Sequence, residues 1–260
     1  MTRFWNRNAD TPWGFAIYRT VYTEQSSQVW KDVVEKLESY LFYSVKRDIE
    51  VKARDMYDEL EDTYGSVLFN DASQFDGMSI DRVRRHWLAM QGRKVDPDPD
   101  SDADDDDDDD DDDDKVEKSK DDENGEAEFE ISQEEIEDFR ADHTNLEFCI
   151  LIDEEVLQSI LSAPATPKEA AKIFPKKWFE SIGYVKVVDQ QSGPGSSHDY
   201  PGWMTVDLTC LWEIYGMDDL ESQYPYEDPR TGKRIVYTGI PPTDPTREYH
   251  YGGVSLGRAM

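Results

Sequence analysis

DPDPDSDADDDDDDDDDDDKVEKSKDDENGEAEFE, residues 96–130, divides this chain into two parts and has no apolar pattern of its own. It holds 22 acidic residues against three lysines, a net charge of −19, whereas the whole chain of 260 residues carries −31. Like charges at this density repel one another, and almost no apolar side chain offsets the entropy of ordering the segment. We therefore expect a disordered acidic insertion between two segments that fold.

The eleven aspartates from Asp104 to Asp114 admit several interpretations. The simplest is a solubilising insertion without a specific partner. A second is electrostatic attraction of a basic protein, such as a histone or a ribosomal protein. Specific calcium binding is disfavoured, because an EF-hand loop needs alternating ligands, a turn glycine and a closing glutamate.

Composition excludes several classes of protein. A net charge of −31 disfavours nucleic acid and anionic membrane surfaces as partners, because both are bound through clustered lysine and arginine. The longest apolar run, residues 148–152, is far shorter than the ~20 residues of a membrane span, and the first residues lack the apolar core of a signal peptide. Cys149 and Cys210 lie in strand-like apolar stretches and are expected to be buried, reduced thiols. These features predict an intracellular protein, in the cytosol or the nucleus.

Before the insertion, residues 13–22 (WGFAIYRTVY) have the aromatic and β-branched composition of a strand. Phe15, Ile17 and Val21 share one face with Arg19, and we expect Arg19 to pair with a carboxylate at the edge of the sheet. The patterns that follow predict a helix capped by Ser26 or Ser27 to about residue 43, a second helix at 45–60, a short strand or packed loop at 67–69, a loop at 70–77, and a helix capped by Ser79 and ending at Gly92. His86, on the last of these helices, is expected to be partly exposed.

After the insertion, strand and helix signals alternate. Ser132 and Glu135 have the spacing of a capping box, and residues 146–152 give the strongest signal for a buried strand. The remaining patterns predict a helix from Asp153 through 161, a short helix with a Thr166–Glu169 capping box, a strand at 184–188, a mobile loop at 190–199, a strand or strand-to-helix transition at 203–215, and an irregular tail beyond 224.

The first part contains one confident strand, and a lone strand cannot make a sheet. We therefore expect residues 15–22 to pair with strands from beyond the insertion. This predicts an α+β fold, a single domain with a small sheet packed by helices and interrupted by the poly-Asp insertion. Its divisions are residues 1–95, the linker 96–130, residues 131–225 of the same domain, and the tail 226–260.

Asp153, Glu154 and Glu155 are the first candidates for chemistry, because they follow a buried strand at the start of a helix. Paired carboxylates can perform acid–base catalysis or bind a metal with other partners. Acids in the first turn of a helix also cap its free amides and interact favourably with its dipole. Capping is the simpler interpretation.

His198 with Asp199 is a second candidate, since a histidine oriented by a carboxylate is one part of a nucleophilic site. No Gly-x-Ser-x-Gly elbow completes it, and no dinucleotide-binding, Walker, His-Glu-x-x-His or Cys-x-x-Cys motif occurs. We therefore expect no cofactor and no metal. Arg19 is a further candidate, as an anion-holding group beside the Asp153–Glu155 cluster.

Several blocks together resemble a known family: residues 13–22 (WGFAIYRTVY), 74–77 (QFDG), 152–157 (IDEEVL), 184–188 (YVKVV) and 201–204 (PGWM). They are similar to a group of uncharacterised intracellular proteins of filamentous ascomycete fungi. The resemblance covers most of both parts and skips the aspartate run. It implies a fungal source and a single domain, and it carries over no catalytic residue.

Three hypotheses for function follow. The first is a non-enzymatic interaction protein, with an aromatic face near Trp203 and Trp212. The second is an enzyme that uses Asp153, Glu154 or Glu155. The third is a binder of basic proteins through the acidic insertion.

Overall fold

The computed structural model describes residues 12–52, 57–93, 129, 131–142, 148–173, 181–190, 200–215, 217, 220–224, 236–239, 249–251 and 254–256. The predicted disorder of residues 96–130 therefore falls outside the described residues, with Phe129 as the one exception. The same holds for nearly all of the predicted loop at 190–199 and for much of the tail.

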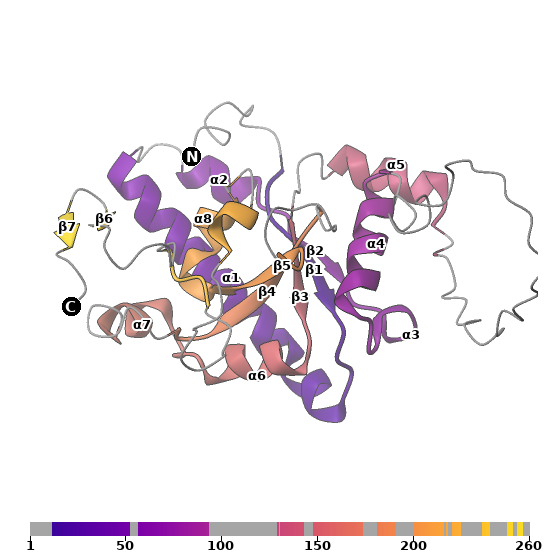
Figure 1. The fold of residues 1–260 in the computed structure, drawn as a ribbon, viewed down its shortest axis with the longest axis horizontal. Helices are drawn as coiled ribbons and strands as arrows, with labels where there is room; N and C mark the ends of the chain where they lie inside the picture. Colours follow the sequence, from indigo (N-terminus) through magenta and orange to yellow (C-terminus); the bar gives the residue numbers. More distant parts are fainter. Residues whose placement is uncertain are drawn as a thin grey trace, which may run out of the picture.

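A five-stranded mixed sheet lies at the centre of the molecule (Figure 1), in the order β2-β1-β3-β4-β5. The neighbours of β1, which are β2 and β3, run parallel to it, whereas β4 pairs antiparallel with β3 and β5 pairs antiparallel with β4. The strands are β1 (Ala16–Arg19), β2 (Val67–Phe69), β3 (Phe148–Ile152), β4 (Tyr184–Asp189) and β5 (Trp203–Asp207). Ile17 of β1 lies opposite Ile150 of β3, so the expected pairing across the acidic insertion is confirmed, as is the α+β class.

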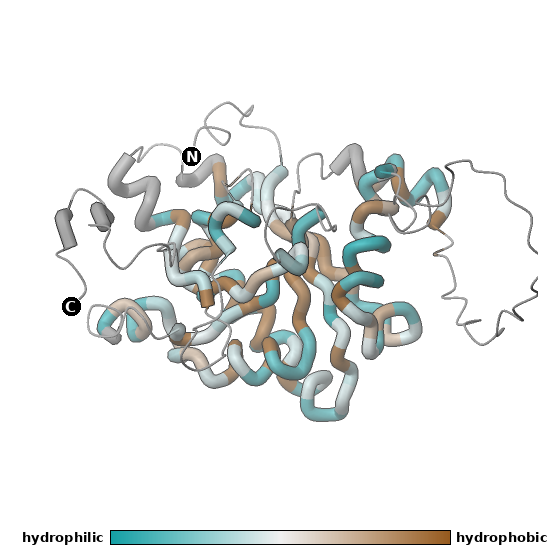
Figure 2. Tube along the Cα trace, in the orientation of Figure 1, coloured by the Kyte–Doolittle hydropathy of each residue, from teal (hydrophilic) through white to brown (hydrophobic). Residues whose placement is uncertain are grey.

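Helices cover both faces of the sheet (Figure 1). One face packs against α1 (Glu24–Lys52), α6 (Glu154–Ser162) and α8 (Leu211–Tyr215), and the other against α3 (Ala72–Phe75), α4 (Ile80–Met90) and α5 (Gln133–Asp142). The short helices α2 (Tyr57–Asp62) and α7 (Pro167–Ile173) complete the set that joins the strands. Along β1 and the residue before it the side chains alternate, with Phe15 and Ile17 in the first core and Ala16 and Tyr18 in the second. Figure 2 shows the central strands as hydrophobic and much of α4 as hydrophilic.

Helix α1 is one continuous helix, and the prediction of two helices meeting near residue 44 is wrong. No proline or glycine interrupts residues 24–52, and Ser44 bonds the carbonyl of Tyr40 within the helix and that of Thr209 outside it. The predicted cap is also wrong. Thr23 accepts from the amide of Ser26, one turn before the position expected for the cap.

Most helix starts agree with the sequence because capping is a local interaction. Ser79 accepts from the amide of Arg82, and Asp153 accepts from that of Val156. Both capping boxes are present, with reciprocal bonds between Ser132 and Glu135 and between Thr166 and Glu169. The loop predicted at 70–77 instead contains α3, a single turn capped by Asp71.

The two edges of the sheet differ. Beyond β5, Tyr237 forms an isolated parallel bridge with the strand. The N–H of Asp207 donates to the carbonyl of Tyr237, and the N–H of Tyr237 donates to the carbonyl of Thr205. In the described part of the chain nothing pairs with the outer edge of β2. The tail is not wholly irregular as predicted, because β6 (Tyr249–Tyr251) and β7 (Val254–Leu256) pair antiparallel. The short turn η6 (Glu221–Gln223) precedes the tail.

The burial of four side chains tests the predictions made for them. His86 is 4% exposed, which contradicts the predicted surface position. Trp212 follows the short η5 turn (Leu208–Cys210), packs at 5.4 Å edge-on to Trp13 in the core, and so cannot form part of a surface face. Cys149 and Cys210 are buried and form no disulfide, as predicted.

Candidate functional site

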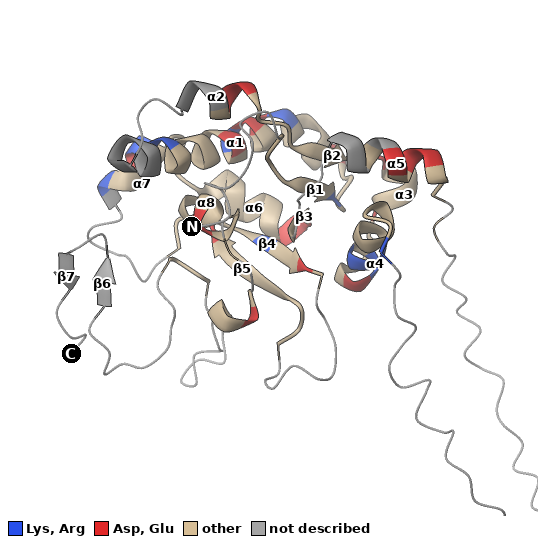
Figure 3. Ribbon diagram, turned by 90° about the horizontal axis from the view of Figure 1, so that it is seen from above, with Lys and Arg blue, Asp and Glu red and all other residues tan. Residues whose placement is uncertain are grey.

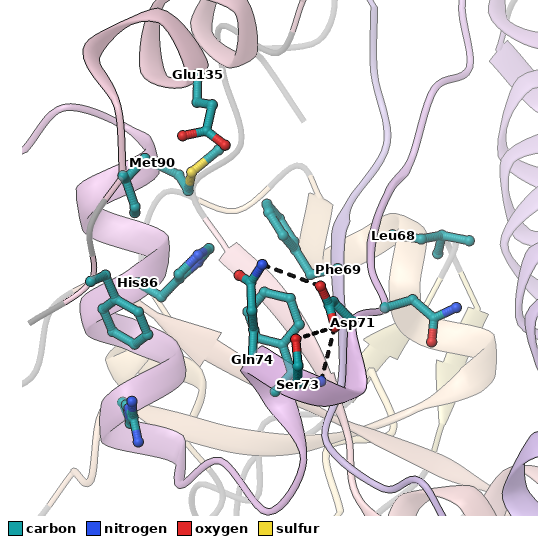
Figure 4. A pocket seen from close by; sticks show the side chains of 13 residues that line it. Leu68, Phe69, Asp71, Ser73, Gln74, His86, Met90 and Glu135 are labelled. Carbon is teal, nitrogen blue, oxygen red and sulfur yellow. Dashed lines mark hydrogen bonds between the residues drawn. The ribbon is translucent and has the colours of Figure 1, made fainter. Parts of the chain in front are cut away.

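A cavity of about 650 Å³ lies at the carboxyl end of β2, between α3, α4 and the residues that lead into α5 (Figure 4). Ligands of open α/β sheets commonly bind beyond the carboxyl ends of strands, so the position is a favourable one. Its apolar lining consists of Leu68, Phe69, Phe75, Met90, Phe129 and Ile131. Its polar lining consists of Asn70, Asp71, Ser73, Gln74, Arg82, His86 and Glu135. We call this cavity the His86 pocket.

Helix α4 contributes one face to the pocket. Arg82, His86 and Met90 are spaced four residues apart, which places them one above another on the same side of the helix. The cap at Ser79 fixes where α4 begins, and therefore which side chains face β2. On the opposite wall β2 ends at Phe69, and the cap at Asp71 turns the chain at once into α3.

His86 projects into the pocket from α4 (Figure 4). Its Nδ1 lies 2.8 Å from the hydroxyl of Tyr18, a central residue of β1. Burial, with a smaller effect of Cys149, raises the pKa of Tyr18, so this phenol keeps its proton. A buried hydroxyl needs an acceptor, and His86 Nδ1 is the partner of this one, so Tyr18 donates and the neutral ring carries its proton on Nε2.

Aromatic rings surround the imidazole of His86. Phe69, Phe75 and Phe129 stand edge-on to it at centroid distances of 5.3, 5.2 and 4.8 Å. Burial lowers the pKa of His86 to about 4, although Glu135 acts in the opposite direction. The ring is therefore neutral near pH 7, and no described residue accepts the Nε2 proton.

Arg82 places a cation at the side of the pocket. Its guanidinium carbon lies 5.2 Å from the centre of the Phe129 ring, within the range of a cation–π interaction. Its Nε is buried and has no hydrogen-bond partner. An unpaired buried donor is unfavourable by about 1–3 kcal/mol, and a ligand acceptor would relieve that cost.

Two carboxylates form the rim. Asp71 accepts from the amide and hydroxyl of Ser73 and from Gln74, which lowers its pKa, and Glu135 accepts from the amide and hydroxyl of Ser132, with the same effect. Both are exposed and remain ionised near neutral pH. Figure 3 shows further acidic residues at the start of α5, so this end of the pocket is negatively charged.

The candidate acidic residues Asp153, Glu154 and Glu155 lie outside the lining of the His86 pocket. Asp153 and Glu155 both form ion pairs with Lys186 of β4, and Glu155 also accepts from the hydroxyl of Tyr184 at 2.7 Å. Burial lowers the pKa of Lys186, but its bonds to the two carboxylates outweigh burial and raise it. Glu154 turns away and accepts from Gln158 on the surface of α6.

Arg19 is not joined to these acids. It donates to the carbonyl of Val21, to Asn70 and to the hydroxyls of Ser26 and Ser27, while Tyr22 and Trp30 lie 4.3 and 4.8 Å from its guanidinium carbon. These partners are neutral, so the expected carboxylate partner is replaced by hydroxyl, amide and aromatic groups. Burial lowers the pKa of Arg19.

His198 lies outside the described residues. In the part of the chain that is described, no group of three or more His, Cys, Asp or Glu residues is placed to hold a metal ion. Arg82 and Phe129 line the pocket although no sequence pattern singled them out, and His86 lies in the pocket instead of at the predicted surface position. The spacing of Arg82, His86 and Met90 was the available signal for a shared face.

Comparison with known proteins adds no further constraint. No family model matches the chain, and it matches no curated protein and no solved structure. No helix of the described residues combines the length and the apolar character needed to cross a membrane.

Proposed function

We propose that this is a non-enzymatic binding protein, whose His86 pocket takes an apolar group of a partner together with one hydrogen-bond acceptor. The observation that carries the proposal is a pair of unpaired donors, His86 Nε2–H and Arg82 Nε–H, in a cavity walled by phenylalanines. Binding sites are commonly apolar cavities with a few polar groups that fix orientation.

The chemistry of the pocket favours binding over catalysis. A general base works best with a pKa near the working pH, and burial holds the pKa of His86 at about 4. The one hydroxyl among the pocket's lining residues, that of Ser73, donates to Asp71 rather than to His86. A nucleophile beside a base is therefore missing from the described lining.

The enzyme hypothesis for Asp153, Glu154 and Glu155 is less well supported. Asp153 caps α6, Glu155 shares Lys186 with it, and Glu154 bonds within its own helix. Each carboxylate has a structural partner, and none of them lines the His86 pocket.

We also propose that the protein is intracellular and of fungal origin. Two buried thiols that form no disulfide support a reducing compartment. The fungal origin depends on the sequence blocks quoted above.

Phenylacetamide, which carries one aromatic ring and one carbonyl, is a suitable probe. Titration calorimetry of the full chain should give a saturable 1:1 isotherm, because the ring fits among the phenylalanines and the carbonyl meets the two donors. Arg82→Met keeps the apolar stem and removes the donor, so we expect binding to weaken about five- to tenfold. Arg85→Met, on the same helix but outside the pocket lining, is the matched control and should bind as the wild type does. Equal affinities of the two variants would contradict the proposal.

A further inference from the structure

The wall of the His86 pocket formed by β2 is also an open sheet edge. Val67 donates its N–H to the carbonyl of Phe15 at 2.9 Å, so the backbone groups of Val67 face β1. Because backbone groups alternate sides along a strand, the N–H and C=O of Leu68 face outward. No described residue pairs with them, whereas the opposite edge of the sheet is covered by Tyr237.

The side chains of β2 alternate in the same way. Val67 and Phe69 pack on the side of α4, whereas Leu68 lies at the margin of the pocket with its side chain turned away from His86 (Figure 4). Leu68 is 43% exposed, the one large hydrophobic residue of the described chain that is exposed. An extended segment paired with Leu68 would place alternate side chains into the pocket and over Leu68, as adjacent residues of a strand point to opposite faces.

The charge around the outer edge of β2 favours a positively charged segment as the partner. The rim acids Asp71 and Glu135 are ionised, and the first turn of α5 adds Glu134. The described residues on either side of most of the acidic stretch lie here, since α4 ends at the pocket residue Met90 and the next described residue after 93 is the pocket residue Phe129. A net charge of −19 is thus tethered to this site by sequence alone. A positively charged partner is attracted and a negatively charged one is repelled.

We propose that the partner is an extended, basic peptide segment of another protein, which adds a strand to the outer edge of β2 and inserts one apolar side chain into the His86 pocket. Its main-chain bonds to Leu68 supply affinity, and the pocket and the acidic surroundings supply specificity. Arg82 Nε and His86 Nε2 then meet backbone or side-chain oxygens of the peptide. This inference depends on the proposed function of the pocket and names the partner class for it.

The test uses the full-length protein and a fluorescent nine-residue peptide with a central phenylalanine, flanking valines and basic residues at both ends. Fluorescence anisotropy should show saturable binding that weakens at least about tenfold when the salt concentration rises from about 50 to about 300 mM. The same peptide with serines in place of its basic residues should bind at least about tenfold more weakly. Equal binding of the basic and serine peptides would overturn the charge assignment.

Two N-methylated versions of the peptide test the sheet edge on unaltered protein. Each carries N-methyl groups along one edge only, and pairing with β2 uses one edge of the peptide. One version should therefore lose binding about tenfold while the other binds as the parent does. Equal effects of both versions would overturn strand addition.

Protein variants complete the test. Leu68→Pro removes an N–H that faces away from β1, so the native ladder is kept while the docking donor is lost. Replacing the aspartates 104–114 by asparagines keeps the length of the insertion and should reduce both affinity and its salt dependence. If phenylacetamide binds but the peptide does not, the inference fails and the pocket function stands. If neither binds, both fail.

Discussion

The hydroxyl of Tyr18 bonds Nδ1 of His86 at 2.8 Å, joining strand β1 to the pocket face of α4. The two residues are 68 positions apart, and the rings of Phe69 and Phe75 lie against both. This bond sets which nitrogen of His86 presents its proton to the cavity. The binding chemistry of the pocket therefore depends on a residue of the sheet that does not line it.

Tyr18→Phe removes the hydroxyl that donates to His86 Nδ1 and should change the tautomer of the imidazole ring. Nδ1 loses its partner in a buried site, so we expect a loss of about 1–3 kcal/mol in the free energy of unfolding. The ring nitrogen resonances of His86 should show mixed tautomers instead of a single Nε2–H form. Tyr40→Phe is the matched control, because Tyr40 donates to the carbonyl of Pro164 and is far from His86 in the fold. It should lower stability without changing the His86 resonances; identical spectra for the wild type and Tyr18→Phe would refute the assigned tautomer.

Stability should fall with acid in a way that depends on His86. Its pKa is about 4 when folded and about 6.5 when unfolded, so the unfolded chain binds the proton more tightly. The stability that depends on a neutral His86 is fully present above about pH 6.5 and is lost as the pH falls towards 4. The free energy of unfolding should decrease over this range by a total on the order of 3 kcal/mol. Urea unfolding of the wild type and His86→Gln at several pH values isolates this effect from the carboxylates. Parallel pH profiles of the two proteins would show that His86 is not held neutral.

Asp153→Ala should destabilise the protein by about 1–2 kcal/mol, because it removes both the cap of α6 and one partner of Lys186. Glu154→Ala, one residue later, loses an exposed bond to Gln158 and should change stability by less than about 0.5 kcal/mol. Thermal or urea unfolding measures both. The structural role of Asp153 is contradicted if the two substitutions have the same effect.

Gly14→Ala should disturb the close contact between the residues before β1 and those before β2. Gly14 has a φ of +151°, and a methyl group there would lie 2.8 Å from the amide nitrogen of Ser66. We expect a loss of about 1–3 kcal/mol in unfolding free energy. Gly65→Ala meets no atom within 4 Å and serves as the control. Similar stabilities for both variants would argue against this close approach.

Sequence reasoning succeeded where the determining contacts are local. The caps at Ser79 and Asp153 depend on residues one turn away, and the burial of residues 148–152 is visible in their composition. The predicted division near Ser44 is wrong because no proline or glycine interrupts residues 24–52, so the helix continues to Lys52.

The pocket was beyond the same reasoning for a physical reason. His86 is buried by Tyr18 of β1, by Phe69 beyond α1 and by Phe129 at the far end of the acidic insertion. Their meeting depends on the pairing of β1 with β2 and on the packing of α4, neither of which a local pattern encodes. Arg19 shows the same limit, since its partners Ser26 and Asn70 come from separate elements.

The most direct test of the binding site is a long-range ¹H–¹⁵N spectrum of the histidine rings while phenylacetamide is added to the wild-type protein near pH 7. We expect one resonance pair of a neutral Nε2–H ring for His86, and a saturable shift of that Nε2 with the amides of Phe69 and Phe129. An unchanged His86 ring, with shifts at Asp153 and Lys186 instead, would place the binding site at the acidic cluster and contradict the assignment of the pocket.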